Sequence, residues 1–350
     1  MKPDAFIILT PGFPKNKSDS TCLPAQQLFV RILKEKYPGL QIIVIAFQYP
    51  FFIAEYGWND CTVIALGGKG KGKIHRLMLW RRAWLRLKLF AKEKQIVGLL
   101  SFWCGECALI GKRFGRQYGI VHKCWILGQD AKKENHFVRK IRPEPTELIA
   151  MSDFLNDVFL TNHSVQPAFV ITNGIDPRSF HDEKLLRDID ILGVGSLIPL
   201  KQFDVFIGVM VNLKKYFPSV RALICGKGPE KIVLEEMIIA NGLQENIALV
   251  GELPHPEVLH LMSRSKLLLH CSVYEGFPTV CLEALAAGTS VIGFIQPMKQ
   301  AISNWHIVEK SSAMAEKAIH ILNNPETKFE DRIPYRMEEC VQKIMQLFSN

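Results

Sequence analysis

Short apolar runs rich in β-branched residues alternate with helical patterns along most of this chain. That alternation limits the possible folds more than any other feature. In the first half, the stretches 23–36 and 106–118 have the apolar spacing of helices. Strands are predicted around them at 6–9, 42–47, 61–66, 96–101, 122–127 and 148–151. Strands that alternate with helices form a parallel sheet covered on both faces, and ligands bind at the carboxyl ends of its strands.

A second alternation follows the turn cluster Asn173-Gly174-Ile175-Asp176-Pro177. Its predicted strands lie at 190–194, 220–225, 247–250, 267–271 and 290–294. Its predicted helices lie at 202–216, 229–241, 255–264 and 278–287. A length of 350 residues also suits two domains of roughly 150 residues each. The sequence therefore predicts two tandem α/β domains with a cleft between them.

The stretch 274–288 joins a predicted strand to a helix that is apolar on every side except at Glu283. Pro278 suits the first turn of a helix, and Gly288 suits the position just past its end. A lone carboxylate in a buried helix is costly unless something binds to it. The turn 276–279 would aim backbone N–H groups at an anion. The stretch thus offers a phosphate site and a carboxylate for sugar hydroxyls; the alternative is a helix start whose Glu pairs with a structural Arg.

The pattern E-G-F-P-x4-E-A-x-A-x-G, from Glu275 to Gly288, resembles the E-x7-E signature of the retaining glycosyltransferases of family 4. Members of that family have the GT-B fold and use nucleotide-sugar donors. Three further segments resemble family motifs: 173–176 the N-G-[VI]-D domain connection, 193–201 the V-G-R-x4-K segment, and 226–229 the G-x-G-P turn. The resemblance is close over 170–296 and loose over 1–168.

The resemblance implies a GT-B α/β fold: two Rossmann-like, doubly wound parallel-sheet domains facing across a cleft. The first domain, 1–168, would bind the acceptor, and the second, 169–330, would bind the nucleotide sugar. The last segment, 331–350, would form a helix that crosses back to the first domain.

The resemblance also assigns roles to residues. Lys201 and the N–H groups of 276–279 would meet the charge of the diphosphate. Glu275 would hold the donor sugar and Glu283 would accept from ribose hydroxyls. The family's Arg is Ser196 here and its His is Leu127, which leaves Gln129 and Asp130 as the polar groups at that turn. The predicted catalytic residues are Lys201, Glu275 and Asp130. The predicted donor-binding residues are Gly195, Ser196, Lys201, Gly226, Gly276, Phe277, Pro278, Thr279 and Glu283.

The segment 69–94 carries ten basic residues against one acidic residue, Glu93, and so accounts for the whole formal net charge of +9. Apolar residues, two tryptophans among them, recur in it at roughly helical spacing. An anionic membrane surface, a core helix with a solvated basic face, and nucleic acid are the three interpretations. The resemblance favours the membrane, because many family members reach lipid-linked acceptors through such a helix. We therefore expect an anionic membrane surface as a partner and no nucleic acid.

Nine cysteines, no export signal and no apolar run near the ~18–20 residues of a membrane span indicate reduced thiols in the cytoplasm. With the basic segment, this predicts a peripheral protein at the inner face of the membrane. Trp103-Cys104-Gly105-Glu106-Cys107 lies between a strand and a helix, as a thioredoxin-type redox motif does. A redox or metal site competes there with two small buried residues in a strand-to-helix turn.

The resemblance implies a metal-independent hexosyl transfer with retention, and no cofactor apart from the donor, with UDP- or GDP-sugar most expected. The acceptor would be lipid-linked or a polysaccharide, as in the biosynthesis of surface glycans such as lipopolysaccharide. Two alternatives come from other classes. One is a nucleotide-sugar epimerase or phosphorylase of the same architecture, and the other is a non-catalytic, membrane-associated partner that keeps the fold.

Overall fold

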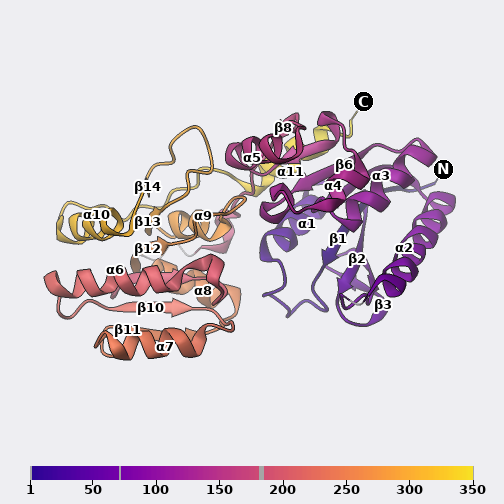
Figure 1. Cartoon of the computed structure of the whole chain (residues 1–350). Coiled ribbons are helices and arrows are strands. Elements are labelled where there is room, and N and C mark those ends of the chain that lie inside the picture. Colours follow the sequence, from indigo (N-terminus) through magenta and orange to yellow (C-terminus); the bar gives the residue numbers. More distant parts are fainter. Residues whose placement is uncertain (1, 71, 181–184, 350) are drawn as a thin grey trace. The chain divides into compact units, whose positions relative to one another are not determined.

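The computed structural model describes residues 2–70, 72–180 and 185–349. The chain forms two compact units, Met1–Gly174 together with Met337–Asn350, and Ile175–Arg336 (Figure 1). The boundaries expected from the sequence, after 168 and after 330, lie a few residues earlier in the chain. Among the described residues, no helix combines the length and the apolar character needed to cross a bilayer.

The first unit is built on an eight-stranded sheet in the order β3-β4-β2-β1-β5-β6-β7-β8. All neighbouring strands are parallel except β3 and β4. The strands are β1 (Asp4–Gly12), β2 (Gln41–Tyr49), β3 (Ile53–Trp58), β4 (Cys61–Leu66), β5 (Gln95–Phe102), β6 (His122–Ile126), β7 (Leu148–Ala150) and β8 (Phe169–Val170). Six of them occupy the predicted positions.

Helices cover both faces of this sheet. They are α1 (Pro24–Lys36), α2 (Lys73–Glu93), α3 (Glu106–Tyr118), α4 (His136–Ile141), α5 (Asp153–His163) and α11 (Met337–Gln346), with short 3₁₀ turns η1 (Gly128–Ala131) and η2 (Pro145–Glu147). Buried residues of α2 and α3 pack with Ile7 and Leu9 of β1. Side chains alternate along a strand, so Phe6 points to the opposite face, where its ring meets Phe348 just beyond α11.

The second unit contains a six-stranded sheet in the order β11-β10-β9-β12-β13-β14, parallel throughout. Its strands are β9 (Ile189–Val194), β10 (Ala222–Cys225), β11 (Ile247–Gly251), β12 (Ser265–His270), β13 (Ser290–Gly293) and β14 (Trp305–Ile307). Its helices are α6 (Phe203–Tyr216), α7 (Lys231–Ala240), α8 (His255–Ser263), α9 (Thr279–Ala286) and α10 (Ser311–Asn323), with 3₁₀ turns η3 (Pro177–Ser179) and η4 (Pro199–Lys201). Residues of α6, α7 and α10 share one core with the sheet.

Both sheets reverse their winding direction at one place. In the first unit the chain runs outward from β1 through β2 to β4 and then returns to β5 on the other side of β1. In the second unit it runs from β9 to β11 and returns to β12. The loops that leave the carboxyl ends of two such strands diverge, and the space between them is where open α/β sheets bind ligands. The fold therefore points to one candidate site beside β1 and β5 and another beside β9 and β12.

Candidate functional site

Lys201 and Glu275 meet at the point where the second sheet reverses direction. Lys201 ends η4, which follows β9, and Glu275 lies in the loop between β12 and α9. The Lys201 ammonium and the Glu275 carboxylate form an ion pair, and both side chains are only partly exposed. The two residues that the sequence placed on a diphosphate and on a sugar are therefore each other's partners in this structure. Because both charges reach solvent, they can also turn to a ligand.

His270, which the sequence analysis did not single out, faces the same pair. It is the last residue of β12, and its side chain is 5% exposed. Its Nε2 lies 3.8 Å from Glu275 Oε1. Burial, with a smaller contribution from the positive charge of Lys201, lowers the pKa of His270 to about 3. The imidazole is therefore neutral at physiological pH. The available signal was a polar residue that ends the otherwise apolar run 267–269.

Glu283 pairs with a histidine in place of the structural Arg considered above. Its Oε1 lies 2.8 Å from Nε2 of His255, the first residue of α8. Helix α9 begins at Thr279, with Pro278 as its N-cap residue, close to the predicted start. Phe277 is buried, and its ring makes edge-to-face contacts with Trp305 and Tyr335. These contacts hold the loop between β12 and α9 in place.

The glycine turns after β9 and β10 are packed directly against each other. The N–H of Gly195 donates to the Cys225 carbonyl at 3.0 Å. Gly226 has φ +153°, and a Cβ added to it would lie 1.8 Å from the Gly195 carbonyl oxygen. No side chain fits there, so Gly226 is required for this close approach of two backbones. Ser196 is exposed beside this contact.

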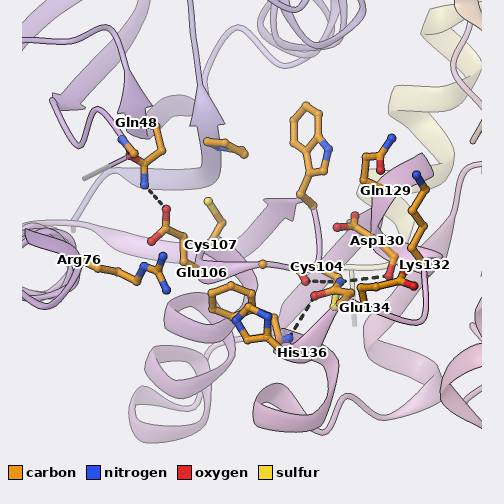
Figure 2. Close-up of a pocket in the computed structure, with 16 residues that line it drawn as sticks. Gln48, Arg76, Cys104, Glu106, Cys107, Gln129, Asp130, Lys132, Glu134 and His136 are labelled. Carbon is orange, nitrogen blue, oxygen red and sulfur yellow. Dashed lines mark hydrogen bonds between the residues drawn. The ribbon is translucent and has the colours of Figure 1, made fainter. Parts of the chain in front are cut away.

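The first unit contains a pocket of about 480 Å³ at its own reversal point. Its lining comes from the ends of β1, β2, β5 and β6 and from α2, α3 and α4, and it combines tryptophan, carboxylate, amide and basic side chains (Figure 2). Glu106 is fixed in it from two sides: Gln48 Nε2 donates to one carboxylate oxygen and Trp80 Nε1 donates to the other at 2.8 Å. Each carboxylate oxygen retains a lone pair that can accept from a hydroxyl group.

Asp130 lines this pocket but also caps a turn. Its Oδ2 accepts the Leu127 N–H at 2.8 Å and so closes η1. Burial raises the pKa of Asp130 to about 7. The structure thus gives this predicted catalytic residue a definite local role, holding the strand-to-helix turn. Gln129 beside it is exposed at the pocket rim.

Trp103 lines the pocket with a backbone conformation that is rare for a bulky residue. Its φ is +68°, and its N–H donates to the Trp125 carbonyl at 3.0 Å. Positive φ in a residue with a large side chain costs free energy, and such residues cluster at functional sites. An aromatic ring beside carboxylates and amides is the composition of a pocket for a ring that carries hydroxyl groups.

Cys104 and Cys107 are buried free thiols. Burial raises the pKa of the Cys107 thiol well above its usual value, whereas a reactive thiol needs a lowered one. Across the described ranges, 2–70, 72–180 and 185–349, no three His, Cys, Asp or Glu side chains gather as metal ligands. The geometry favours two small buried residues in a strand-to-helix turn over a redox site.

Helix α2 divides into a buried and an exposed face. Leu79, Ala83, Leu87 and Phe90 are buried against the sheet and α3. Trp80 and Trp84 are half-buried, and Trp84 packs edge-to-face on Phe114, so neither tryptophan lies on the outer face. That face instead presents aliphatic residues between basic ones: Ile74, Leu77, Met78, Arg81, Arg82, Leu85, Lys88, Leu89 and Lys92.

A known family model matches the part of the chain that forms the second unit. Residues 177–337 match the family model of glycosyl transferases group 1. The gpi3 subunit of phosphatidylinositol N-acetylglucosaminyltransferase from Schizosaccharomyces pombe is 27% identical over 202 residues, which are 56% of this chain and 44% of that protein. 2-Deoxystreptamine N-acetyl-D-glucosaminyltransferase from Niallia circulans is 25% identical over 173 residues, 49% of this chain and 41% of that protein. The matches span less than half of each of these relatives.

The whole chain resembles a solved structure in fold. The crystal structure of HepE from Anabaena, in complex with UDP and glucose, matches with a TM-score of 0.67 and 14% identity over 99% of this chain and 95% of that one. The fold is therefore mixed α/β with two parallel-sheet units, as in the GT-B glycosyltransferases.

Proposed function

We propose that this protein is a glycosyltransferase that moves a sugar from a nucleoside diphosphate to a hydroxyl group of an acceptor. The observation that carries the proposal is the Lys201–Glu275 pair at the reversal point of the second sheet, inside the segment that matches the group 1 family model. A cation and a carboxylate at the carboxyl ends of parallel strands suit the two halves of a nucleotide sugar. We extend the proposal to the retaining reaction of family 4 on the strength of the E-x7-E pattern.

The donor we propose is UDP-N-acetylglucosamine. Two relatives with different acceptors in their names are both N-acetylglucosaminyltransferases, and the HepE structure contains UDP. Lys201 would leave Glu275 for the diphosphate and neutralise the negative charge that develops on the leaving group. Backbone N–H groups at the start of α9 would add to this, since a helix amino end favours anions. Glu283, held by His255, would accept from ribose hydroxyls.

The acceptor we propose is a cyclitol or sugar ring bound in the pocket of the first unit. The relatives are named for phosphatidylinositol, whose inositol headgroup is a six-membered carbocycle with hydroxyl groups, and for 2-deoxystreptamine, which is itself such a ring. Trp103 offers an aromatic face to the carbon-bound hydrogens of such a ring, while Glu106 accepts from its hydroxyls. Arg76, on the α2 side of the pocket, suits a phosphate attached to the ring.

We also propose that the first unit rests on an anionic membrane surface, at the cytoplasmic face, when it binds a lipid-linked acceptor. The support is the outer face of α2, where exposed aliphatic and basic side chains mix. Phe51 and Phe52, in the connection that follows β2, and Ile53, the first residue of β3, are exposed. This connection lies against the residues that lead into α2, since a Cβ on Gly67 would lie 2.9 Å from the Phe52 carbonyl carbon. Gly70, in the residues that lead into α2, and Arg76 of α2 itself line the pocket.

The test combines binding and turnover. Thermal unfolding with UDP, GDP, ADP and UDP-N-acetylglucosamine should show selective stabilisation, about 2.7 kcal/mol at a ligand concentration of 100 Kd. Transfer of N-acetylglucosamine to phosphatidylinositol in mixed micelles should follow. The Lys201→Met change should lower kcat by about 10²–10³, as removal of a transition-state donor does. Lys231→Met, an exposed lysine on α7, serves as the matched control.

Three results would count against the proposal. If none of the four nucleotides stabilises the folded protein, the second unit is not a donor site. Binding without transfer or hydrolysis would favour the non-catalytic partner. The presence of Ser196 and Leu127 in place of the family's Arg and His agrees with that alternative. Equal loss of activity in the Lys201 and Lys231 variants would remove Lys201 from the site.

A further inference from the structure

We propose that His270 is a further donor-site residue that positions the transferred sugar by a hydrogen bond between its Nε2 and a sugar hydroxyl. The inference rests on the proposed function, since it assumes that the Lys201–Glu275 pair receives a nucleotide sugar. It adds a residue that no family motif in the sequence contains.

The position of His270 is fixed by the sheet. It ends β12, at the strand end beside which the winding reverses, and it pairs in register with Gly293 of β13. A Cβ on Gly293 would lie 3.2 Å from the His270 carbonyl oxygen and 3.5 Å from the His270 Cβ, so the two strands pack closely at this position. The imidazole is enclosed by its neighbours, with only 5% of the side chain exposed. A group fixed in this way can orient a ligand at little cost in conformational entropy.

The imidazole presents a buried polar atom that no described residue satisfies. His270 Nε2 has no hydrogen-bond partner, and the same is true of Ser272 Oγ two residues further on. The two side chains are 5% and 1% exposed. Buried polar atoms are almost always paired, so two unpaired ones beside a charged pair point to a ligand as their partner.

The distance to Glu275 indicates what kind of ligand atom fits. At 3.8 Å, Nε2 and Oε1 are too far apart for a hydrogen bond with each other. An oxygen atom at ordinary hydrogen-bond distance from both can lie between them. A hydroxyl oxygen satisfies both groups when the neutral imidazole carries its proton on Nε2, because the hydroxyl then donates to the carboxylate and accepts from the Nε2–H.

A phosphate oxygen fits this position poorly. It carries negative charge and would lie next to the Glu275 carboxylate, which repels it. The His270 imidazole is neutral, because burial and the Lys201 charge lower its pKa to about 3, so it brings no compensating positive charge. The geometry thus assigns the two parts of the donor to different residues. Lys201 binds the diphosphate, and Glu275 with His270 binds the sugar.

The experiment compares affinity for the nucleotide with affinity for the nucleotide sugar. The probes are UDP and UDP-N-acetylglucosamine, measured by isothermal titration calorimetry on the full chain. His270→Leu should leave the Kd for UDP within about twofold and raise the Kd for UDP-N-acetylglucosamine about tenfold, the usual effect of one lost hydrogen bond. His270→Gln, whose amide reaches the place of Nε2, should recover part of that loss. His260→Leu, the same change at an exposed position of α8, is the control.

Each outcome either supports or overturns the role of His270. Equal weakening of UDP and UDP-N-acetylglucosamine, or no change in either, would overturn the role of His270 while the proposed function stands. A wild-type protein that binds neither probe would remove the proposed function itself, and this inference with it. If the H270L protein fails to fold, H270N replaces it in the comparison with H270Q, because the shorter amide ends at the place of Nδ1.

Discussion

Asp130 illustrates how a single residue can serve the fold and line a pocket at once. Its carboxylate accepts the Leu127 N–H. The side chain is buried and lines the pocket together with Cys104 and Asn135. Burial disfavours the charged form more than that hydrogen bond favours it, so the pKa rises to about 7. The folded protein therefore binds this proton more tightly than the unfolded chain, whose Asp has a pKa of about 3.9.

The sign of the resulting pH effect follows from that difference. The stability associated with protonated Asp130 is fully present below about pH 4 and is lost as the pH rises towards 7. Asp130→Asn keeps an oxygen for the Leu127 N–H but cannot ionise. We expect the melting temperature of this variant to fall less than that of the wild type between pH 4 and pH 7. Asp157→Asn, on the exposed side of α5, is the control; identical slopes for Asp130→Asn and wild type would contradict the prediction.

Two glycine-to-alanine changes test backbone packing, and we expect one to lower and the other to raise the free energy of unfolding. Gly226→Ala places a Cβ against the Gly195 carbonyl, and neither backbone can yield without breaking the turns after β9 and β10. We expect a loss of about 3 kcal/mol in the free energy of unfolding, or no folded protein. Gly208→Ala lies within α6 and meets nothing within 4 Å, so it should stabilise by up to about 1 kcal/mol. Chemical denaturation measures both, and similar values for the two variants would show that the close approach is not required.

At the level of elements, the strands that the sequence predicts well are the buried parallel ones. The bounds of β4 match the prediction, and β1, β2 and β5 extend it at both ends, because continuous apolar runs mark strands buried on both faces. Strand β3 was missed: its residues alternate in exposure at an edge of the sheet, and Glu55 and Gly57 interrupt the apolar pattern. The signal was the turn Asn59-Asp60, where both residues have positive φ, as a two-residue hairpin requires. The two- and three-residue strands β8 and β14 are too short to show a period.

For helix α2, the sequence predicted the element but not which of its faces is buried. Its composition predicted a basic helix, and the structure supplies the division of that helix into faces, which depends on where α3 and the sheet cover it. The tryptophans, which were part of the argument for a membrane surface, are half-buried within the first unit. The aliphatic residues between the basic ones form the exposed face instead.

This division makes the membrane proposal testable. Replacing Arg81 and Arg82 by Gln removes two exposed charges from α2 without touching its buried face. At about 1 kcal/mol for each basic residue, binding to vesicles of anionic phospholipid should weaken roughly 30-fold. Arg139 and Lys140, an adjacent exposed basic pair on α4, are changed in the control. Cosedimentation that is the same for both double variants would mean that α2 does not direct the binding.

At the scale of the whole molecule, two sheets with one winding scheme provide two binding positions of different composition. The proposed donor position could be predicted from the sequence because Glu275, Glu283 and Lys201 occur at the spacing of a family pattern. His270 and the Trp103 pocket were not, because their significance depends on which strand ends lie together: Gln48, Glu106 and Asp130 are far apart in the chain and meet only through the order of β2, β5 and β6 (Figure 2). Spacing along a sequence identifies a site carried by one loop, and a site assembled from several strands needs the topology.

The first unit is interrupted in the sequence, and this affects how the chain is made. Its last helix, α11, packs against α1, and Phe348 packs on Phe6, although the whole second unit lies between them in the sequence. One face of the first unit is therefore completed by a helix that is synthesised only after the whole second unit. The second unit is continuous in the sequence, whereas the first unit lacks α11 until the end of the second unit has been made. A chain that stops just before that helix would contain every strand of the second unit, but it would leave α1 without the helix that it packs against and Phe6 without Phe348.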